Sequence, residues 1–244
     1  MTGRRAAVAA SSAGLGFATA AALAAEGARV ALCGRDEAKL QAAAAQIGER
    51  AVPLVADVST VAGALGFVRG ATDALGGLDI LVTNAGGPPP ATATEATLEQ
   101  HRAALEANCL GAIAMCEEAL PAMRAQRWGR IVAITSLGVR QPIPTLVLSN
   151  TARTALHAFL RTLAREVAGD GVTVNSVQPG TIETDRIRFL FQGDMRAAAA
   201  AVPAGEVGQP AQFGQVAAFL CSEAAAYVTG VAIPVDGGTY SGLL

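Results

Sequence analysis

The residues best suited to chemistry begin with a turn near the start of the chain, Ser11-Ser12-Ala13-Gly14-Leu15-Gly16. The turn follows an apolar run and precedes an alanine-rich segment, which is the pattern of a strand, a turn and a helix. Gly14 and Gly16 allow the backbone to approach a pyrophosphate closely, and the free N–H groups of a helix N-terminus favour a negative charge. The same composition also suits a turn that only packs a helix on a sheet.

Polar residues follow further predicted strands. Cys33-Gly34-Arg35 ends the second strand, Asp57-Val58 follows the third, and Asn84-Ala85-Gly86 follows the fourth. Because the carboxyl ends of parallel strands meet along one edge of a sheet, we expect these groups to converge where open α/β sheets bind nucleotides.

Arg35 indicates which dinucleotide would bind. An acidic residue at this position would accept hydrogen bonds from both ribose hydroxyls, whereas Gly34 cannot and Arg35 can pair with a 2′-phosphate through two hydrogen bonds. We therefore expect NADP as the cofactor rather than NAD. The alternative is that Arg35 is a solvated residue at the start of a helix.

The elements that must position these groups are short apolar runs that alternate with helical stretches, a rhythm that predicts βαβ units and a parallel sheet. Runs such as Ile80-Leu81-Val82 lack in–out alternation, which is typical of strands covered by helices on both faces. We predict an α/β fold with a single Rossmann-type doubly wound parallel sheet of about seven strands. The predicted strands span residues 5–10, 28–33, 51–56, 79–83, 130–135, 172–178 and 231–235.

No linker or internal repeat divides the 244 residues, so we expect one dinucleotide-binding domain over residues 1–244. Long helices are predicted over 97–125 and 145–168. The stretch 186–208 interrupts the rhythm with short helical pieces, glycines and a proline, a composition typical of a mobile substrate lid.

The composition excludes several classes of protein. Eighteen Lys and Arg against twenty Asp and Glu leave a net charge of −2, so we expect no nucleic-acid partner. The uncharged stretch 6–25 is interrupted by serines and glycines, which argues against a signal peptide or a membrane span. Four cysteines show no metal-ligand or disulfide spacing, so we expect no metal site and a cytoplasmic location.

Taken together, these motifs resemble the short-chain dehydrogenase/reductase family, in particular its β-ketoacyl-(acyl carrier protein) reductase-like branch. The resemblance covers essentially the whole chain. Besides the motifs above it includes Asn108, Ser136, the segment from Asn175 to Thr184, Val228-Thr229-Gly230, and Val235-Asp236-Gly237-Gly238.

The resemblance implies a set of cofactor-binding residues. The glycine turn, with Ser11, Ser12, Gly14, Leu15 and Gly16, would hold the pyrophosphate. Asp57 and Val58 would contact adenine, and Asn84, Ala85 and Gly86 would line a ribose. Pro179, Gly180, Ile182 and Thr184 would hold the nicotinamide carboxamide.

The sequence also departs from the family pattern. The glycine turn usually begins Thr-Gly, whereas Ala9-Ala10 stands here, so we expect the first turn to avoid any backbone conformation that a Cβ forbids. The family's catalytic set is Asn, Ser, Tyr and Lys. Its spacing leads from Asn108 and Ser136 to Ser149 and Arg153, so the Tyr and the Lys are both replaced.

The replacements alter the expected chemistry. A serine hydroxyl is far less acidic than a phenol and reaches less far, while an arginine stays protonated and can hold ribose hydroxyls without relaying a proton. Arg153 shares a helix face with Ser149. Lys39 is the only lysine, and of the two tyrosines, Tyr227 and Tyr240, only Tyr240 could be a relocated donor; packing or a place in a subunit interface is the alternative.

Other polar residues carry weaker signals. Arg140 and Gln141 could border a substrate pocket or belong to a rigid turn, and we favour the turn. His101 and His157 lie in helical stretches without a Ser or Asp at a recognisable spacing, so we expect structural roles.

The leading hypothesis is an NADP-dependent oxidoreductase that acts on a carbonyl or alcohol, such as an acyl thioester or another small molecule, through Asn108, Ser136, Ser149 and Arg153. The alternative is a catalytically silent nucleotide-binding or scaffold homologue. Dehydration or isomerisation would need an acid–base pair that we do not find. The apolar composition and the two long helices, with the resemblance, imply a homodimer or homotetramer.

Overall fold

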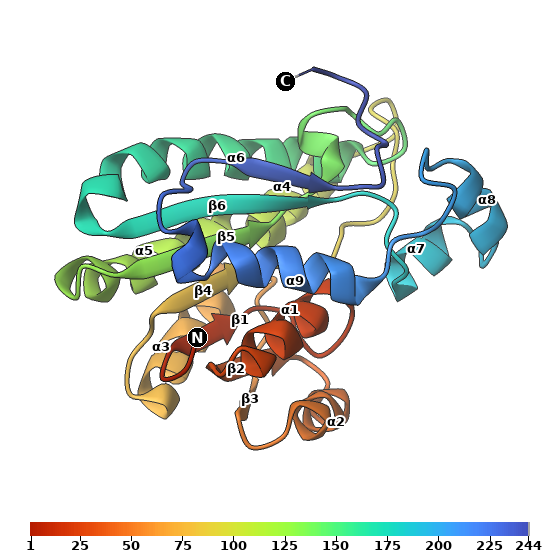
Figure 1. Cartoon of the computed structure of the whole chain (residues 1–244). Helices are drawn as coiled ribbons and strands as arrows, with labels where there is room; N and C mark the ends of the chain where they lie inside the picture. Colours follow the sequence, from red (N-terminus) through yellow and green to blue (C-terminus); the bar gives the residue numbers. More distant parts are fainter. Residues whose placement is uncertain (244) are drawn as a thin grey trace.

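Seven parallel strands form one sheet in the order β3-β2-β1-β4-β5-β6-β7 (Figure 1). This computed structural model describes residues 1–243. The predicted fold class is confirmed, and each strand ends within two residues of its expected bounds. The strands are β1 (Arg5–Val8), β2 (Arg29–Gly34), β3 (Ala51–Val55), β4 (Ile80–Thr83), β5 (Gly129–Ile134), β6 (Val172–Pro179) and β7 (Ala232–Val235).

Helices cover both faces of the sheet. On one face lie α3 (Val61–Leu75), α5 (Gly111–Ala125) and α6 (Val147–Val167), with α4 (Leu98–Leu105) packed on α6. On the other face lie α1 (Gly14–Ala25), α2 (Glu37–Ile47) and α9 (Pro210–Leu220), and α1 and α9 run side by side (Figure 1). Successive strand residues alternate between the two hydrophobic cores, which explains why the strands are apolar throughout.

The helical stretch predicted over 97–125 is interrupted within its length. Between α4 and α5 the chain forms a π-helical turn, Glu106–Leu110. Such a turn holds one extra residue and is frequent at functional sites. Here it carries Asn108 and packs against α6.

Two short helices lie beyond the carboxyl ends of the strands, α7 (Asp185–Leu190) and α8 (Met195–Ala200) (Figure 1). They fall within or next to the stretch 186–208, for which we predicted short helical pieces. They stand apart from the three layers of the sheet and its covering helices, on the side where a ligand would enter.

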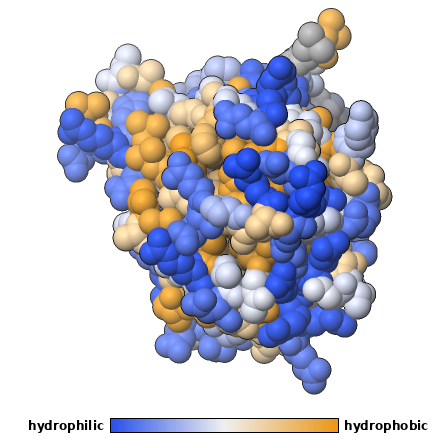
Figure 2. Space-filling view, turned by 90° about the vertical axis from the view of Figure 1, so that its left-hand side faces the viewer, coloured by the Kyte–Doolittle hydropathy of each residue, from blue (hydrophilic) through white to orange (hydrophobic). Residues whose placement is uncertain are grey.

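The amino-terminal edge of the sheet is closed by charged and aromatic side chains. Two guanidinium groups lie close to the Trp128 ring, with the Cζ atoms of Arg4 and Arg130 at 3.5 and 4.3 Å from its centroid. Glu223 accepts hydrogen bonds from Arg4 and from the Trp128 indole. Figure 2 views the molecule from this side, where hydrophilic and hydrophobic residues are mixed. Within residues 1–243, no helix has both the length and the apolar character of a membrane span.

Candidate active site

A cavity of about 580 Å³ opens at the carboxyl edge of the sheet, near the point where β1 and β4 lie side by side and the strand order reverses. This is the position at which open α/β sheets bind ligands. Many of the predicted site residues line it together: Gly14, Leu15, Asn84, Ala85, Gly86, Ser136, Ser149, Arg153, Pro179, Gly180, Ile182 and Thr184. The sheet therefore brings groups that are distant in the sequence to one place.

The glycine turn forms one end of this cavity. A Cβ at Gly16 would lie 2.4 Å from the Ala10 carbonyl oxygen and 2.9 Å from Asn84 Nδ2, so no larger residue fits without displacing the turn. The Asn84 amide in turn donates to the same carbonyl at 3.1 Å. Within residues 1–243, no side chain caps the N-terminus of α1, and its first turn holds no acidic residue. Its N–H groups and positive dipole end are therefore available to an anion.

The expectation about Ala10 was wrong. We expected the first turn to avoid a conformation that a Cβ disfavours, but Ala10 has φ +45°, in the left-handed region. The chain turns sharply there because Ala9 belongs to the sheet core while the Ala10 carbonyl must reach Asn84. The turn therefore has the backbone conformation that a glycine would adopt, and the Cβ of Ala10 makes this conformation sterically unfavourable.

The two serines of the turn have different surroundings. Ser11 is fully buried; its hydroxyl donates to the Val8 carbonyl at 2.7 Å and accepts from the Cys33 amide at 3.1 Å. Its side chain therefore joins β1 to β2. The Ser12 hydroxyl packs on Gly34, where a Cβ would lie 2.8 Å from it. Ser12 thus stands at the end of β2, beside Arg35.

Arg35 and Asp57 lie on the surface at the ends of β2 and β3. Among the described residues, Arg35 forms no hydrogen bond or ion pair. Hydrogen bonds from Ser59 and the charge of Arg35 lower the pKa of Asp57. Val58 is buried in the core, so only its backbone could contact a ligand. Arg35 remains free to meet a phosphate.

The two candidate catalytic serines face the cavity from different elements. Ser136 follows β5, and its hydroxyl oxygen accepts a hydrogen bond from the Gly138 amide at 3.0 Å, which leaves its O–H free to donate. Ser149 lies in the first turn of α6 and is 7% exposed. The Ser149 hydroxyl makes no hydrogen bond within residues 1–243, so it is also free to meet a ligand.

Arg153 lies one helical turn beyond Ser149 and also lines the cavity. Its guanidinium donates to the Ile134 carbonyl at 2.7 Å and to the Ala85 carbonyl at 3.3 Å. It is 7% exposed and has no acidic partner in the described part of the chain. Burial and the nearby charge of Arg186 lower its pKa to about 10, so it stays protonated at neutral pH.

Asn108 lies behind the cavity. Its side chain is buried in the π-helical turn, and its Oδ1 atom has no hydrogen-bond partner among the described residues. Asn108 is not part of the cavity wall. A group held at this oxygen would have to lie inside the protein, against α6.

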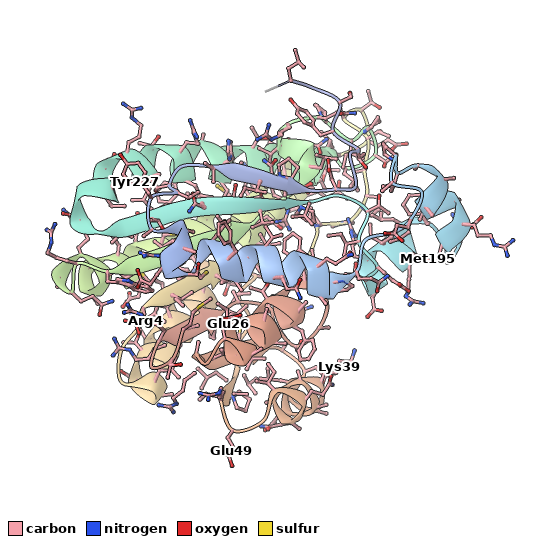
Figure 3. All side chains as sticks on the ribbon, in the orientation of Figure 1. Arg4, Glu26, Lys39, Glu49, Met195 and Tyr227 are labelled. Carbon is pink, nitrogen blue, oxygen red and sulfur yellow. The ribbon has the colours of Figure 1, made fainter. Side chains whose placement is uncertain are left out.

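The proposed relocated tyrosine does not line the cavity. The Tyr240 ring lies against Arg140, whose Cζ is 5.2 Å from the ring centroid, so its position agrees with the packing alternative. Tyr227 is fully exposed at the opposite end of the molecule from α7 and α8, and Lys39 points outward from α2 (Figure 3).

The turn interpretation of Arg140 is supported. Its guanidinium donates to Gln178 at 2.7 Å and to the Ala232 carbonyl at 2.8 Å, which ties the turn after β5 to β6 and β7. Gln141 lines the cavity. His157 is partly buried, and its pKa is lowered by burial and by Arg161 and Arg140.

Our sequence reasoning missed Asn150 and Arg186. The Asn150 amide donates to the Ile143 carbonyl at 2.9 Å and so holds the loop that carries Ile143 and Leu146 against the cavity. Arg186 enters the cavity from α7. The feature of the sequence that could have indicated Arg186 is its position directly after Thr184-Asp185, next to the segment predicted to hold the nicotinamide.

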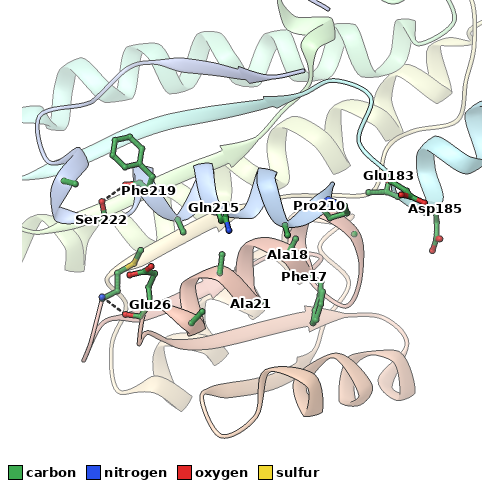
Figure 4. A pocket seen from close by; sticks show the side chains of 18 of the residues that line it. Phe17, Ala18, Ala21, Glu26, Glu183, Asp185, Pro210, Gln215, Phe219 and Ser222 are labelled. Atoms are coloured by element: carbon green, nitrogen blue, oxygen red, sulfur yellow. Dashed lines mark hydrogen bonds between the residues drawn. The ribbon is translucent and has the colours of Figure 1, made fainter. Parts of the chain in front are cut away.

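A larger groove, about 950 Å³, runs between α1 and α9 (Figure 4). Ala18 and Ala21 of α1 and Pro210 and Phe219 of α9 are among the residues that line it. Its lining is mostly apolar, and Glu183 and Arg188 at one end pair with each other. The smaller cavity, with its free hydroxyls and buried cation, is therefore the candidate active site.

The fold and this cavity define a dinucleotide-binding oxidoreductase of the Rossmann type. A family model described as "Enoyl-(Acyl carrier protein) reductase" matches residues 9–240. The chain is 33% identical to the 3-oxoacyl-[acyl-carrier-protein] reductase of Vibrio cholerae, over 98% of each chain, and 34% identical to that of Escherichia coli, again over 98% of each. The chain belongs to the short-chain dehydrogenase/reductase family.

Solved structures of other proteins share this fold. The L-sorbose reductase of Gluconobacter frateurii, complexed with NADPH and L-sorbose, is 32% identical and has a TM-score of 0.93, covering 100% of this chain and 98% of that one. YwfH, an NADPH-dependent reductase involved in bacilysin biosynthesis, is 26% identical with a TM-score of 0.94, covering 98% and 99%.

Proposed function

We propose that this protein is an NADP-dependent reductase or dehydrogenase that acts on a carbonyl or alcohol through Ser136, Ser149 and Arg153. The observation that carries the proposal is the cavity itself, in which two free hydroxyls and a buried guanidinium lie near an uncapped helix N-terminus. Substrate oxygen and cofactor anion would each meet hydrogen-bond donors there.

The residues present fit the cofactor. Gly16 allows the close approach that the turn requires, and α1 offers unpaired N–H groups to the pyrophosphate. Arg35 would meet a 2′-phosphate, which supports NADP over NAD, and two structural neighbours are NADPH-dependent or NADPH-bound. Pro179, Gly180, Ile182 and Thr184 would hold the nicotinamide end, and Arg153 would hold its ribose hydroxyls.

When bound, the reduced cofactor supplies a hydride to the substrate carbonyl carbon. Negative charge then develops on the carbonyl oxygen, and the hydroxyls of Ser136 and Ser149 donate hydrogen bonds to it. The charge of Arg153, buried beside Ser149, stabilises the same oxygen. Ser149 passes the final proton from solvent. A water held at the Asn108 Oδ1 atom would have to reach Ser149 from inside the protein, because Asn108 does not line the cavity. The product is an alcohol.

Several finer features belong to this proposal. The substrate is a small carbonyl compound or an acyl thioester, since relatives from two bacteria act on 3-oxoacyl carrier proteins. Residues 186–208 act as the lid, because Ile187, Leu190 and Phe191 already form part of the cavity wall. The protein acts as a homodimer or homotetramer in the cytoplasm.

The test is stopped-flow oxidation of NADPH with a panel of keto esters, oxo acids and acyl thioesters. Ser149→Ala should lower kcat about a hundredfold, the usual effect of losing one oxyanion donor. Thr2→Ala, which removes an exposed hydroxyl near the amino-terminal edge of the sheet, is the control and should leave kcat unchanged. No turnover of any substrate above background would count against the proposal.

The silent-homologue alternative predicts a different pattern. It requires tight NADPH binding in a calorimetric titration without turnover. The double variant Ser149→Tyr with Arg153→Lys, which restores the family's side chains, would then create activity. If the wild type already turns over substrate, the alternative is removed.

A further inference from the structure

Two guanidinium groups share the active-site cavity without a carboxylate partner. Arg153 is buried, and Arg186 is half-buried on α7. Neither forms an ion pair with any residue in the range 1–243. Asp185 is the only acidic residue that we find on the cavity wall within this range, and it is exposed and pairs with neither arginine. Unpaired buried cations are costly, so this arrangement points to an anionic ligand.

Most hydrogen-bond donors of Arg186 are unused. A guanidinium carries five N–H donors, and among the described residues Arg186 makes one hydrogen bond, from Nη2 to the Pro88 carbonyl at 2.7 Å. Its guanidinium packs over Gly87, where a Cβ would lie 3.1 Å from Nε. Pro88 and Gly87 thus hold the group in place over the cavity and leave donors free for a planar anion.

The pyrophosphate of the cofactor is not the best partner for Arg186. The uncapped N-terminus of α1, with Gly14 and Gly16, already offers N–H donors to that group. Arg186 instead lies over Gly87, two residues from Ala85, whose carbonyl accepts a hydrogen bond from Arg153, and both guanidinium groups line the same cavity. Since Arg153 lies one turn from Ser149, an anion at Arg186 would sit beside the reacting group.

The rest of the cavity wall suits an apolar substituent. The apolar residues that line it include Leu137, Ile143 and Leu146, together with Leu190 and Phe191 of the lid segment. A ligand that fits both features has a negative charge close to the carbonyl and an aliphatic or aromatic remainder.

We infer that the substrate of this enzyme is an oxo or hydroxy acid with a free carboxylate, held by Arg186, and is not an acyl thioester. The inference rests on the proposed function for the reaction itself, but the anion site can be tested separately. A thioester has no charge near its reacting carbonyl and would leave both guanidinium groups unpaired.

The binding test uses hexanoate and hexanamide, which differ in charge and little in shape. Their affinities for the enzyme, with and without NADP⁺, are measured by saturation-transfer NMR. The wild type should bind hexanoate about tenfold to a hundredfold more tightly, the usual worth of charge-assisted hydrogen bonds. Arg186→Gln should abolish this preference, and Arg186→Lys should retain part of it.

The matched control is Arg188→Gln, an exposed arginine on the same short helix that pairs with Glu183. It should keep the preference for hexanoate. The NADPH affinity of Arg186→Gln, measured by cofactor fluorescence, should stay within about twofold of the wild type. In turnover, kcat/KM for 2-oxohexanoate or 3-oxohexanoate should exceed that for its methyl ester by a similar factor.

Equal binding of hexanoate and hexanamide would overturn the inference. So would weaker NADPH binding by Arg186→Gln with the hexanoate preference intact, because Arg186 would then serve the cofactor. A hexanoate preference that depends on Arg186, found without any NADPH oxidation, would support the anion site and remove the proposed reaction.

Discussion

Ala10 has a backbone conformation that is ordinarily reserved for glycine. With φ +45° its Cβ meets steric hindrance of about 1 to 2 kcal/mol, while glycine in this place would cost about 0.5 to 1 kcal/mol in backbone entropy. Ala10→Gly should therefore stabilise the protein by up to about 1 kcal/mol, measured by urea denaturation.

The neighbouring alanine is the control for this substitution. Ala9 is fully buried, and its φ angle is not positive. Ala9→Gly should destabilise the protein by about 1 kcal/mol because it removes a buried methyl group and adds backbone freedom. Equal effects at both positions would contradict the strain argument.

Arg35 should decide the choice of dinucleotide. It is exposed at the end of β2, and its donors are free among residues 1–243. Arg35→Ala should weaken NADPH binding about tenfold to a hundredfold and leave NADH binding nearly unchanged, since only NADPH carries the 2′-phosphate. Calorimetric titrations with both cofactors measure this.

The control for Arg35→Ala is a substitution of Arg50, which lies at the amino-terminal edge of the sheet. Arg50 is exposed just before β3 and donates to the Gly27 carbonyl. Arg50→Ala should leave both affinities unchanged. Parallel losses of NADPH and NADH affinity in Arg35→Ala would show that the residue does not recognise the 2′-phosphate.

At the scale of elements, the starts of β1 and β4 are joined through Asp79. Its carboxylate accepts from Arg5 Nε and Nη2 and from the Arg5 backbone amide, all at 2.9 Å. Burial raises the pKa of Asp79, but the hydrogen bonds and charge of Arg5 outweigh it, so the net pKa is lowered. The folded state therefore favours the charged carboxylate.

This link predicts a pH-dependent stability. Because the pKa of Asp79 is lower in the folded state, its charged carboxylate stabilises the fold at any pH above the unfolded-state pKa, about 3.9. This stabilisation is lost as the pH falls through the folded-state pKa. Asp79→Asn should cost about 2 kcal/mol at pH 7. The difference from the wild type should shrink below about pH 4 in urea denaturation.

Asp73, exposed on α3, controls for a general loss of charge. Asp73→Asn should change stability by less than about 0.5 kcal/mol at either pH. A cost for Asp79→Asn that does not vary with pH would mean that packing, rather than the charge, is responsible.

At the scale of the whole molecule, the outer face of α6 exposes a row of small residues. Thr151, Thr154, Ala155 and Ala158 are all exposed along it. Sedimentation should show a species above the 24.5 kDa of one chain. Ala155→Arg should shift the distribution toward 24.5 kDa, because a long charged side chain disrupts close helix packing.

Ala38→Arg is the corresponding change at an exposed position of α2, and it should leave the assembly intact. A wild type that sediments as one chain at all concentrations would remove the oligomer proposal. The folded structure of the monomer would be unaffected by that result.

Ser149 and Arg153 were predicted from the family resemblance, whose catalytic spacing leads to them from Ser136, whereas local patterns were sufficient to predict the sheet and the glycine turn. The sheet and the turn follow from strand and helix periodicities and from the rule that parallel strands end at one edge. The apolar run 80–83, for example, predicts a strand buried on both faces, and β4 is fully buried. Such features depend on near neighbours in the chain.

Other features depended on contacts between distant segments. The Ser11 hydroxyl points inward, where it accepts a hydrogen bond from the Cys33 amide on β2. Ala10 has a left-handed backbone conformation, in which its carbonyl accepts a hydrogen bond from the Asn84 side chain after β4. The position of Arg186 above Gly87 likewise requires α7 to meet the loop after β4. Tertiary packing decides these because each partner lies tens of residues away, where no local periodicity carries the information.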